Sequence, residues 1–256
     1  MTQIHPTAQK GFSSAAELYQ QVRPSYPQEL INWLKDQLQI QKNDIVVDLG
    51  AGTGKFIPYL QDVFSQVIAV EPVAEMLSQL QQYYPDVQAL QASSQDLPLA
   101  TGTVDAVICA QSFHWFADLT SLQEIHRILK PGGHLGLIWN QRDIGVDWVK
   151  ALADLIEPFE GNTPRYHRGQ WREVLTQQTL FHHESLQIFE QKHVGSVEQV
   201  VSKRLLSTSF IAAMPTHQQQ QFKQQFEKIV QDYTGKSAQD LIEFPYVTYA
   251  YHWQKV

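Results

Sequence analysis

The sequence predicts an α/β protein with a doubly wound, mostly parallel sheet. Strand-like apolar runs alternate with helix-like segments, as in a parallel sheet covered by helices on both faces. The runs are short and rich in Val, Ile and Leu, as is typical of strands buried on both faces. A glycine-rich turn follows the first run, where such sheets bind ligands. The predicted parallel strands are Ile45–Leu49, Val67–Glu71, Val87–Leu90, Ala106–Ala110 and His134–Trp139.

Helices are predicted between these strands from the spacing of apolar residues. Gln28–Leu38 begins after Pro27, and Leu119–Leu129 should end at Lys130-Pro131-Gly132-Gly133, because Pro and Gly extend a helix poorly. Beyond Asn140 the alternation becomes irregular, and this later part is expected to combine sheet closure with a cap.

A longer helix is predicted over His217–Tyr233. Its four consecutive glutamines are interpreted as a solvated face and not as a low-complexity interaction tract. The residues expected on its apolar face are Phe222, Phe226, Ile229, Val230 and Tyr233.

Composition and charge limit the class of protein. The 256 residues, 43% of them hydrophobic, suffice for one large core. A net charge of -7 and a pI near 5.8 argue against a nucleic-acid partner, because phosphates require a concentrated basic face. Cys109 is the single cysteine, the stretch Met1–His5 lacks a signal pattern, and no apolar run reaches membrane-spanning length. We therefore predict a cytoplasmic protein with neither nucleic acid nor membrane as partner, and leave its oligomeric state open.

The turn after the first strand reads Asp48-Leu49-Gly50-Ala51-Gly52-Thr53-Gly54. Without a Cβ, its glycines allow a sharp turn and let a ligand lie against peptide groups. Phe56 follows Gly54-Lys55 where a triphosphate-binding loop needs Ser or Thr. The spacing G-x-G-x-G also differs from the G-x-G-x-x-G of nicotinamide sites. The loop therefore favours an adenosine-like cofactor without a pyrophosphate.

Two acidic residues flank this turn. Glu71 follows an apolar run, where an acid is costly without hydrogen-bond donors, and the two hydroxyls of a ribose are such donors. Asp48 precedes the first glycine by two residues. It is expected either to orient the loop or reach the amino group of the cofactor, or to cap the amides of the turn.

Five segments in a fixed order carry a resemblance to a known family. They are the glycine loop, Val70-Glu71-Pro72 with Met76, Ser94-Gln95-Asp96-Leu97-Pro98-Leu99, Val104-Asp105-Ala106-Val107, and Ile128-Leu129-Lys130-Pro131-Gly132-Gly133. Over about residues 40–142 the chain resembles class I S-adenosylmethionine-dependent methyltransferases. Its flanks resemble the methyltransferase type 11 branch, which acts on small molecules and includes trans-aconitate methyltransferase-like proteins. The flanking matches are Phe12, Tyr19, Arg23-Pro24, Tyr26-Pro27 and Phe244-Pro245-Tyr246.

The resemblance implies a seven-stranded, Rossmann-like sheet. Ser185–Val194 and Phe244–Trp253 would pair as an antiparallel hairpin at its edge. The chain is then one methyltransferase domain, 1–256. Its expected parts are an N-terminal helical cap (1–40), a cofactor-binding core (41–142), and an acceptor cap with the sheet-closing strands (143–256).

The resemblance also implies S-adenosylmethionine as cofactor. Arg23 would hold the methionine carboxylate, with Tyr19 over the cofactor; the alternative is a surface arginine that precedes Pro24. Ser93 stands where the family often has an acid for the adenine amine, so this contact is expected to pass to Ser94, Gln95 or the backbone. The expected cofactor-binding residues are Tyr19, Arg23, Asp48, Gly50, Ala51, Gly52, Gly54, Glu71, Pro72, Met76, Ser93, Ser94, Gln95, Ala110 and Gln111.

The methyl acceptor in this fold sits after the fourth strand. The chain lacks the Pro-Pro-Tyr type segment found there in nucleic-acid and protein amide N-methyltransferases, so the resemblance favours a small molecule. His114 is a candidate general base, or alternatively a packed core residue, and a carboxylate acceptor would need no base. Trp115, Trp139 and Asn140 are expected to contact the acceptor.

Charged residues after the fifth strand bear on the nature of the acceptor. Arg142, Arg165, His167 and Arg168 cluster there, and one inward arginine would bind a carboxylate; the alternative is a solvated loop face. His182-His183 has no further ligands at suitable spacing, so no metal site is expected.

The predicted function is transfer of a methyl group from S-adenosylmethionine to a small-molecule acceptor, with O-methylation of a carboxylate as one form. Two alternatives stay open: an NAD(P)-dependent oxidoreductase, and a non-catalytic protein that binds the cofactor on the same fold.

Overall fold

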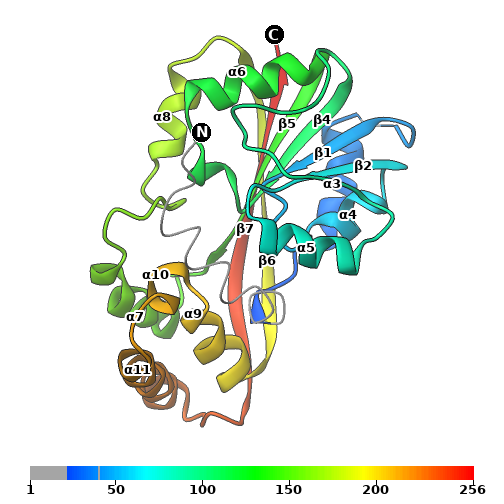
Figure 1. Cartoon of the computed structure of the whole chain (residues 1–256). Coiled ribbons are helices and arrows are strands. Elements are labelled where there is room, and N and C mark those ends of the chain that lie inside the picture. Colours follow the sequence, from blue (N-terminus) through cyan, green and yellow to red (C-terminus); the bar gives the residue numbers. More distant parts are fainter. Residues whose placement is uncertain (1–21, 40) are drawn as a thin grey trace.

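The computed structural model describes residues 22–39 and 41–256, and a seven-stranded sheet forms their centre (Figure 1). The strand order is β3-β2-β1-β4-β5-β7-β6. The first five strands in this order run parallel, whereas β7 is antiparallel to both β5 and β6. This confirms the predicted fold class and the antiparallel edge. The strands are β1 (Ile45–Leu49), β2 (Gln66–Val70), β3 (Gln88–Leu90), β4 (Val104–Ala110), β5 (Leu129–Arg142), β6 (Phe181–Ser196) and β7 (Leu241–Lys255).

Strand β5 differs from its prediction because it begins directly after the preceding helix. Leu129 pairs with Val104, the register shifts, and pairing resumes where His134 lies opposite Ala106. Pro131-Gly132-Gly133 therefore forms an irregularity inside the strand and not a connecting loop, and Gly132 takes a positive φ of 72° there. At β2 the strand ends at Val70, so Glu71 lies just beyond the tip.

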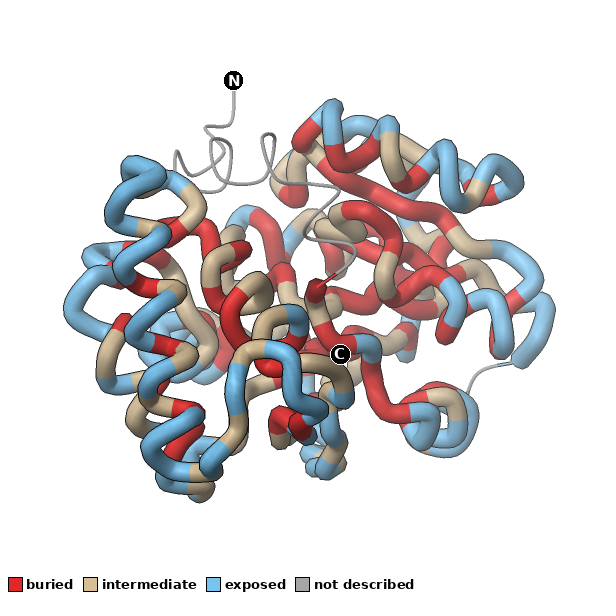
Figure 2. The backbone as a smooth tube through the Cα atoms, turned by 90° about the horizontal axis from the view of Figure 1, so that it is seen from below, coloured by how far each residue is buried: buried red, intermediate tan, exposed pale blue. Residues whose placement is uncertain are grey.

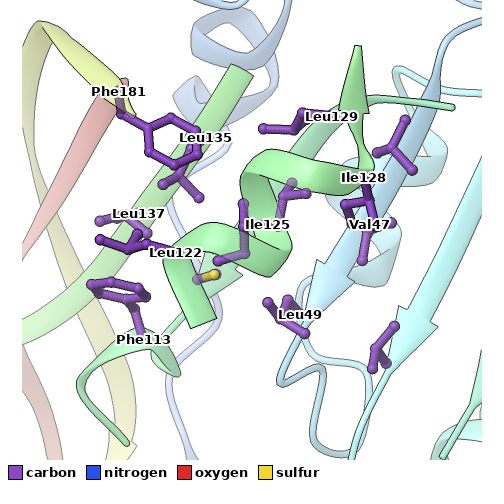
Figure 3. Close-up of a cluster of buried hydrophobic side chains, with 14 of the residues drawn as sticks. Val47, Leu49, Phe113, Leu122, Ile125, Ile128, Leu129, Leu135, Leu137 and Phe181 are labelled. Atoms are coloured by element: carbon purple, nitrogen blue, oxygen red, sulfur yellow. The ribbon is translucent and has the colours of Figure 1, made fainter. Parts of the chain in front are cut away.

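Helices cover both faces of the sheet (Figure 1). On one face lie α3 (Glu29–Gln37), α4 (Ile57–Gln61) and α5 (Ala74–Tyr83). The other face carries α6 (Leu119–Ile128) and α8 (Gln170–Thr176). The apolar spacing of α6 directs Leu122, Ile125 and Ile128 onto strand residues, as Figure 3 shows. These two layers hold the carboxyl ends of the parallel strands in place.

A second apolar core lies at the carboxyl end of β6 and the amino end of β7. It is formed by the cap helices, which Figure 1 shows gathered there: α7 (Asp147–Ile156), η3 (Glu198–Lys203), α9 (Arg204–Leu206), α10 (Ser209–Ala212) and α11 (Thr216–Thr234). Figure 2 shows buried positions on the inner sides of these helices and exposed ones outside. Short helical turns, η1 (Phe113–Trp115) and η2 (Glu157–Phe159), complete the described elements.

Helix α11 confirms most of its predicted pattern. Phe222, Phe226 and Val230 are buried, and the glutamine run is largely exposed. The prediction for Tyr233 was wrong, since its side chain is 57% exposed. It lies on the last turn, beyond the apolar cluster that packs the rest of the helix. Within residues 22–39 and 41–256, no helix is long and apolar enough to cross a membrane.

Candidate active site

A cavity of about 230 Å³, called the loop cavity here, opens at the carboxyl ends of the parallel strands around the glycine turn. Most residues expected to bind the cofactor line it, together with two of those expected to bind the acceptor. Gly54, His114 and Trp139 do not line it, and Tyr19 lies outside the described residues. The predicted residues in its lining are Arg23, Asp48, Gly50, Ala51, Gly52, Glu71, Pro72, Met76, Ser93, Ser94, Gln95, Ala110, Gln111, Trp115 and Asn140.

Glycine is needed at the three positions of the turn for different structural reasons. All three take a positive φ, which side chains rarely adopt. A Cβ on Gly50 would stand 2.5 Å from the Cβ of Ser112, and one on Gly54 would stand 2.7 Å from the ring of Tyr84. Gly52 has only the Met76 methyl group within 4 Å, at 3.5 Å. Gly50 and Gly54 are thus required by packing, whereas Gly52 keeps the cavity open.

Glu71 lies buried at the tip of β2. Its Oε2 accepts a hydrogen bond from the amide of Gly52 at 2.9 Å, and its Oε1 accepts one from Val73 at 3.0 Å. The ribose of a ligand was the predicted source of donors to Glu71, yet the backbone supplies two. Burial raises the pKa of Glu71 to about 7, although both hydrogen bonds act in the opposite direction. Each carboxylate oxygen keeps a lone pair for further donors.

Asp48 is buried beside Glu71 without any such support. Neither of its carboxylate oxygens has a hydrogen-bond partner among the described residues, so it does not cap the amides of the turn. Burial, and then the charge of Glu71, raise the pKa of Asp48 to about 8. An unsatisfied carboxyl that lines a cavity is a group arranged for a cationic or hydrogen-bond-donating ligand.

The loop after β3 meets the start of α6 along one wall of the loop cavity. Ser94 shares a hydrogen bond with Ser121, and the Gln95 amide donates to Oδ2 of Asp118 at 2.5 Å. Asp118 also caps α6 by accepting from the amide of Ser121 at 2.7 Å. Sequence reasoning missed Asp118 as a lining residue. Its position before an apolar helix was the available signal.

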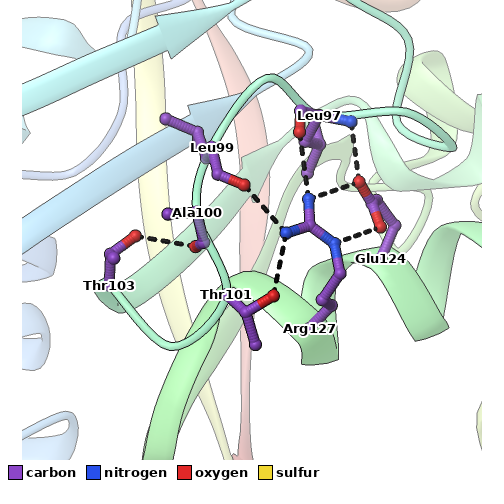
Figure 4. A network of polar contacts seen from close by, with 7 residues as sticks. All are labelled: Leu97, Leu99, Ala100, Thr101, Thr103, Glu124 and Arg127. Carbon is purple, nitrogen blue, oxygen red and sulfur yellow. Dashed lines mark hydrogen bonds and ion pairs between the residues drawn. The ribbon is translucent and has the colours of Figure 1, made fainter.

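Arg127 of α6 anchors the same loop farther along the chain. Its guanidinium donates to the carbonyl oxygens of Leu97 at 3.0 Å and Leu99 at 2.8 Å, and it pairs with Glu124 at 2.6 Å. Figure 4 shows these contacts converging on one side chain. Arg127 thereby ties the segment that carries Ser94 and Gln95 to the helix behind it.

A second cavity of about 70 Å³, called the arginine cavity here, adjoins the first. The two cavities share Arg23, Gln111, Asn140 and Arg204 in their linings. The arginine cavity adds Arg142 and Arg165, and Glu160 is its single acidic lining residue. Four arginines and one acidic residue thus line this cavity. Sequence reasoning did not identify Arg204 or Glu160, because neither carries a local motif.

Arg165 is the most constrained of these cations. Its side chain is 17% exposed, and its guanidinium lies 5.0 Å from the ring centre of Phe210. Nε and Nη2 make no hydrogen bond within the described part of the chain. Burial lowers the pKa of Arg165 to about 10, which Glu160 partly offsets. Arg165 stays charged at neutral pH, and its Nε lies 3.9 Å from Oε1 of Glu160, which makes an ion pair but no hydrogen bond. Its donors therefore remain open to an anion.

Of the other members of the predicted charged cluster, some line the arginine cavity and one does not. Arg142 and His167 line the arginine cavity, whereas Arg168 does not. Glu160 is 4% exposed and accepts a hydrogen bond from Nε2 of His167 at 3.0 Å. The prediction of an inward arginine thus applies to Arg142 and Arg165. Arg168 is exposed outside the lining, with its Nη2 3.9 Å from Oε2 of Glu160.

His114 and Trp139 line the arginine cavity together. The indole N–H of Trp139 donates to Nδ1 of His114 at 3.1 Å. Burial, followed by the charges of Arg165 and Arg23, lowers the pKa of His114 to about 3. The imidazole is therefore neutral at pH 7, and its low pKa makes it a weak base.

The boundary between the cavities is built from β4, β5 and the chain before α3. Arg23 lines both cavities and donates to the carbonyl oxygen of Ser207 at 3.0 Å. Gln111, with a positive φ of 60°, donates its amide to the carbonyl oxygen of Asn140 at 2.8 Å. Asn140 in turn donates to the Ser25 carbonyl and accepts from Thr248. Outside residues 1–21 and 40, no group of three or more His, Cys, Asp or Glu gathers as a metal site would require.

Comparison with known sequences gives a consistent family signal. The model of a methyltransferase domain family matches residues 47–137. An uncharacterised methyltransferase-like protein of Schizosaccharomyces pombe is 32% identical over 247 residues, which cover 96% of each chain. An uncharacterised methyltransferase of Mycobacterium tuberculosis is 39% identical over 183 residues, covering 66% of this chain and 73% of that one.

Comparison with solved structures agrees on the fold. A protein of Anaeromyxobacter dehalogenans, described as a candidate type II methyltransferase, superposes with a TM-score of 0.68 at 22% identity, covering 90% of this chain and 97% of that one. A geranyl diphosphate methyltransferase in complex with S-adenosylmethionine gives a TM-score of 0.50 at 17% identity, covering 90% of this chain and 85% of that one. At these identities the likeness shows the fold alone.

Proposed function

Because this chain belongs to the S-adenosylmethionine-dependent methyltransferases, we propose that it methylates a carboxylate of a small-molecule acceptor. The loop cavity would hold the cofactor, and the arginine cavity would hold the acceptor. The observation that carries the proposal is the pair of unsatisfied guanidinium donors of Arg165 in a cavity with one carboxylate and four arginines.

The residues of the loop cavity fit the cofactor. The two buried carboxyl groups, Asp48 and Glu71, suit the ribose hydroxyls of S-adenosylmethionine, and the positive charge of the cofactor would favour their ionised forms. Met76 lies against the space that a Cβ on Gly52 would fill, so the wall there is apolar and close to the backbone. Arg23, which lines both cavities, would hold the methionine carboxylate.

The chain's own part in the reaction would be binding and orientation. When bound, S-adenosylmethionine supplies a methyl group activated by the positive sulfur: an acceptor oxygen forms the new C–O bond, and the C–S electron pair stays on sulfur. A carboxylate has no proton to lose, so no base is needed. Fixing its orientation and excluding water would then provide most of the acceleration.

Cofactor binding can be tested by calorimetry with S-adenosylhomocysteine. We expect Glu71→Ala to weaken binding at least tenfold, because it removes two hydrogen bonds that hold the loop as well as the contact to the ligand. Glu75→Ala is the matched control, since Glu75 is exposed in the first turn of α5. Binding of NADH in place of S-adenosylhomocysteine would overturn the assignment of the cavity.

The acceptor class can be tested with a panel of small mono-, di- and tricarboxylic acids and a methyl donor labelled on its methyl group. We expect labelled methyl esters, identified by mass spectrometry and released by mild alkali. Amines and alcohols of the same size serve as the comparison. Transfer only to those compounds, with S-adenosylhomocysteine still bound normally, would reject the carboxylate acceptor and leave the cofactor site intact.

A further inference from the structure

Trp139 fixes the tautomer of His114. An indole N–H is a donor only, so Nδ1 of His114, 3.1 Å away, must be the acceptor. In a neutral imidazole one nitrogen accepts and the other carries the hydrogen. The proton of His114 is therefore on Nε2.

The indole of Trp139 is itself held rigidly. It is fully buried, 4.3 Å from the ring centre of Trp171 and 5.1 Å from that of Tyr166. The hydroxyl groups of Tyr166 and Tyr251 share a hydrogen bond of 2.8 Å, and Arg172 donates to Tyr251 at 3.0 Å. This packed aromatic group, between α8 and the strands β5 and β7, leaves the indole N–H one direction, toward His114.

The free side of His114 belongs to the arginine cavity. Among the described residues no hydrogen bond to Nε2 occurs, and after burial the charges that lower the pKa of His114 are, largest first, those of Arg165, Arg23 and His167. These cations oppose a second proton on the ring, but they do not oppose an N–H pointing toward a bound anion. The ring thus adds a neutral donor to a set of charged ones.

We propose that His114 donates a hydrogen bond from Nε2 to the anionic acceptor and takes no proton from it, and that Trp139 is the positioning residue that imposes this arrangement. The proposal rests on the carboxylate acceptor proposed above. It replaces the general-base role that the sequence suggested for His114. It also adds to specificity, because a donor fixed in one direction favours an acceptor oxygen at one place in the cavity.

The tautomer can be measured without any acceptor. In protein labelled with ¹⁵N-histidine, two-dimensional NMR distinguishes a protonated from an unprotonated ring nitrogen. We expect His114 to show hydrogen on Nε2 and none on Nδ1 between pH 6 and 8. Trp139→Phe should convert this signal to a mixture of tautomers.

The matched control for that measurement is Trp33→Phe. Trp33 is 2% exposed and packs in an apolar cluster that contains neither His114 nor Trp139. We expect the His114 signal to stay unchanged in this variant. A wild-type signal with hydrogen on Nδ1, or a signal that Trp139→Phe does not move, would overturn the positioning role.

Two substitutions of His114 distinguish a role as hydrogen-bond donor from a role as general base. A glutamine amide can donate from near the position of Nε2, whereas an asparagine amide reaches only the position of Nδ1, and neither can act as a base. With S-adenosylhomocysteine bound and succinate as the probe, we expect calorimetry to give a succinate affinity within threefold of wild type for His114→Gln. For His114→Asn we expect at least a tenfold loss.

The outcomes distinguish this inference from the proposed function. Suppose that the wild type binds succinate. If His114→Gln and His114→Asn lower the succinate affinity equally, or if neither lowers it, the donor role is rejected and the carboxylate acceptor stands. If the wild type binds neither succinate nor any acid of the panel, the carboxylate acceptor falls and the donor role falls with it. Unchanged affinity for S-adenosylhomocysteine shows that each variant is folded.

Discussion

The loop cavity and the arginine cavity share four lining residues but differ in the charged groups that each adds to them. The first adds two buried carboxyl groups, Asp48 and Glu71, and neither oxygen of Asp48 accepts a hydrogen bond within the described residues; the second adds Arg165, whose Nε and Nη2 make no hydrogen bond there. Unsatisfied groups of this kind cost stability in the empty protein, and a ligand of the opposite charge recovers it. The fold therefore provides two neighbouring binding sites, one suited to a cationic group and the other to an anionic group.

The two regions also differ in how they are built. Asp48, Gly52 and Glu71 come from one strand-turn-helix unit and the next strand, within 24 residues of sequence. The arginines come from four separated places: before α3, the end of β5, the segment before α8, and the start of α9. A short motif therefore defines the acidic cavity, whereas only the folded cap brings the basic one together.

The strongest disruption of the acidic side should come from Gly50→Ala. The new Cβ would stand 2.5 Å from the Cβ of Ser112, at a φ of +74°. We expect a loss of about 3 kcal/mol in the free energy of unfolding and loss of measurable S-adenosylhomocysteine binding. Urea denaturation and calorimetry measure the two effects.

Gly102→Ala is the control for this substitution. Gly102 has a similar φ of +68°, and a Cβ there meets no atom within 4 Å. We expect about 1 kcal/mol of destabilisation from the backbone conformation alone. Equal losses in the two variants would show that the contact with Ser112 does not matter.

On the basic side, the largest effect should come from Arg165→Met. Methionine retains much of the apolar bulk against Phe210 but removes the charged donors. We expect the KM for a carboxylate acceptor to rise by roughly ten- to a hundredfold, about 1.4 to 2.7 kcal/mol, with S-adenosylhomocysteine affinity unchanged. Arg168→Met, outside the cavity lining, should change KM less than twofold. Weakened cofactor binding in Arg165→Met would show that the two cavities are not independent.

The pH dependence of stability tests the buried acid of the loop cavity. Burial raises the pKa of Asp48 to about 8, whereas an unfolded Asp titrates near pH 4. The folded state therefore retains a proton that the unfolded state releases. The stability that this group contributes is complete below about pH 4 and is lost as the pH rises toward 8.

Asp48→Asn should remove that dependence. Between pH 5.5 and 8 we expect the free energy of unfolding of the wild type to fall by about 1–3 kcal/mol relative to the variant. Urea denaturation at both pH values measures the difference. Asp86→Asn, at an exposed position, controls for the loss of one charge. Parallel pH profiles for wild type and Asp48→Asn would contradict the raised pKa.

The sequence predicted the sheet well because its strands are short apolar runs with clear ends. It also placed Asp48 and Glu71 in the site, although it assigned no backbone donors to Glu71. It ended the helix correctly before Lys130-Pro131-Gly132-Gly133 but started the next strand too late, at His134. Pairing with β4 before and after Pro131-Gly132-Gly133 keeps these residues inside β5, which begins at Leu129. The domain boundaries and the roles of the site residues remain predictions.

Residues of the arginine cavity were harder to predict for a physical reason. A charged residue on a loop has the same local sequence signature whether it faces solvent or a cavity, as Arg165 and Arg168 illustrate. What separates them is the packing of Phe210 from α10 against Arg165. Arg204 likewise enters the cavity only because the cap folds over the end of the sheet.

The smallest expected effect concerns the loop that Arg127 anchors. Arg127→Met removes hydrogen bonds to the carbonyl oxygens of Leu97 and Leu99 and the ion pair with Glu124, all partly exposed to solvent. We expect about 1 kcal/mol of destabilisation, measured by urea denaturation. We also expect a two- to fivefold loss of S-adenosylhomocysteine affinity, because the loop that carries Ser94 and Gln95 loses its support. Lys228→Met, which breaks an exposed helical ion pair with Asp232, should change neither quantity measurably. An effect of Arg127→Met on acceptor KM but not on cofactor affinity would mean that this loop serves the basic cavity instead.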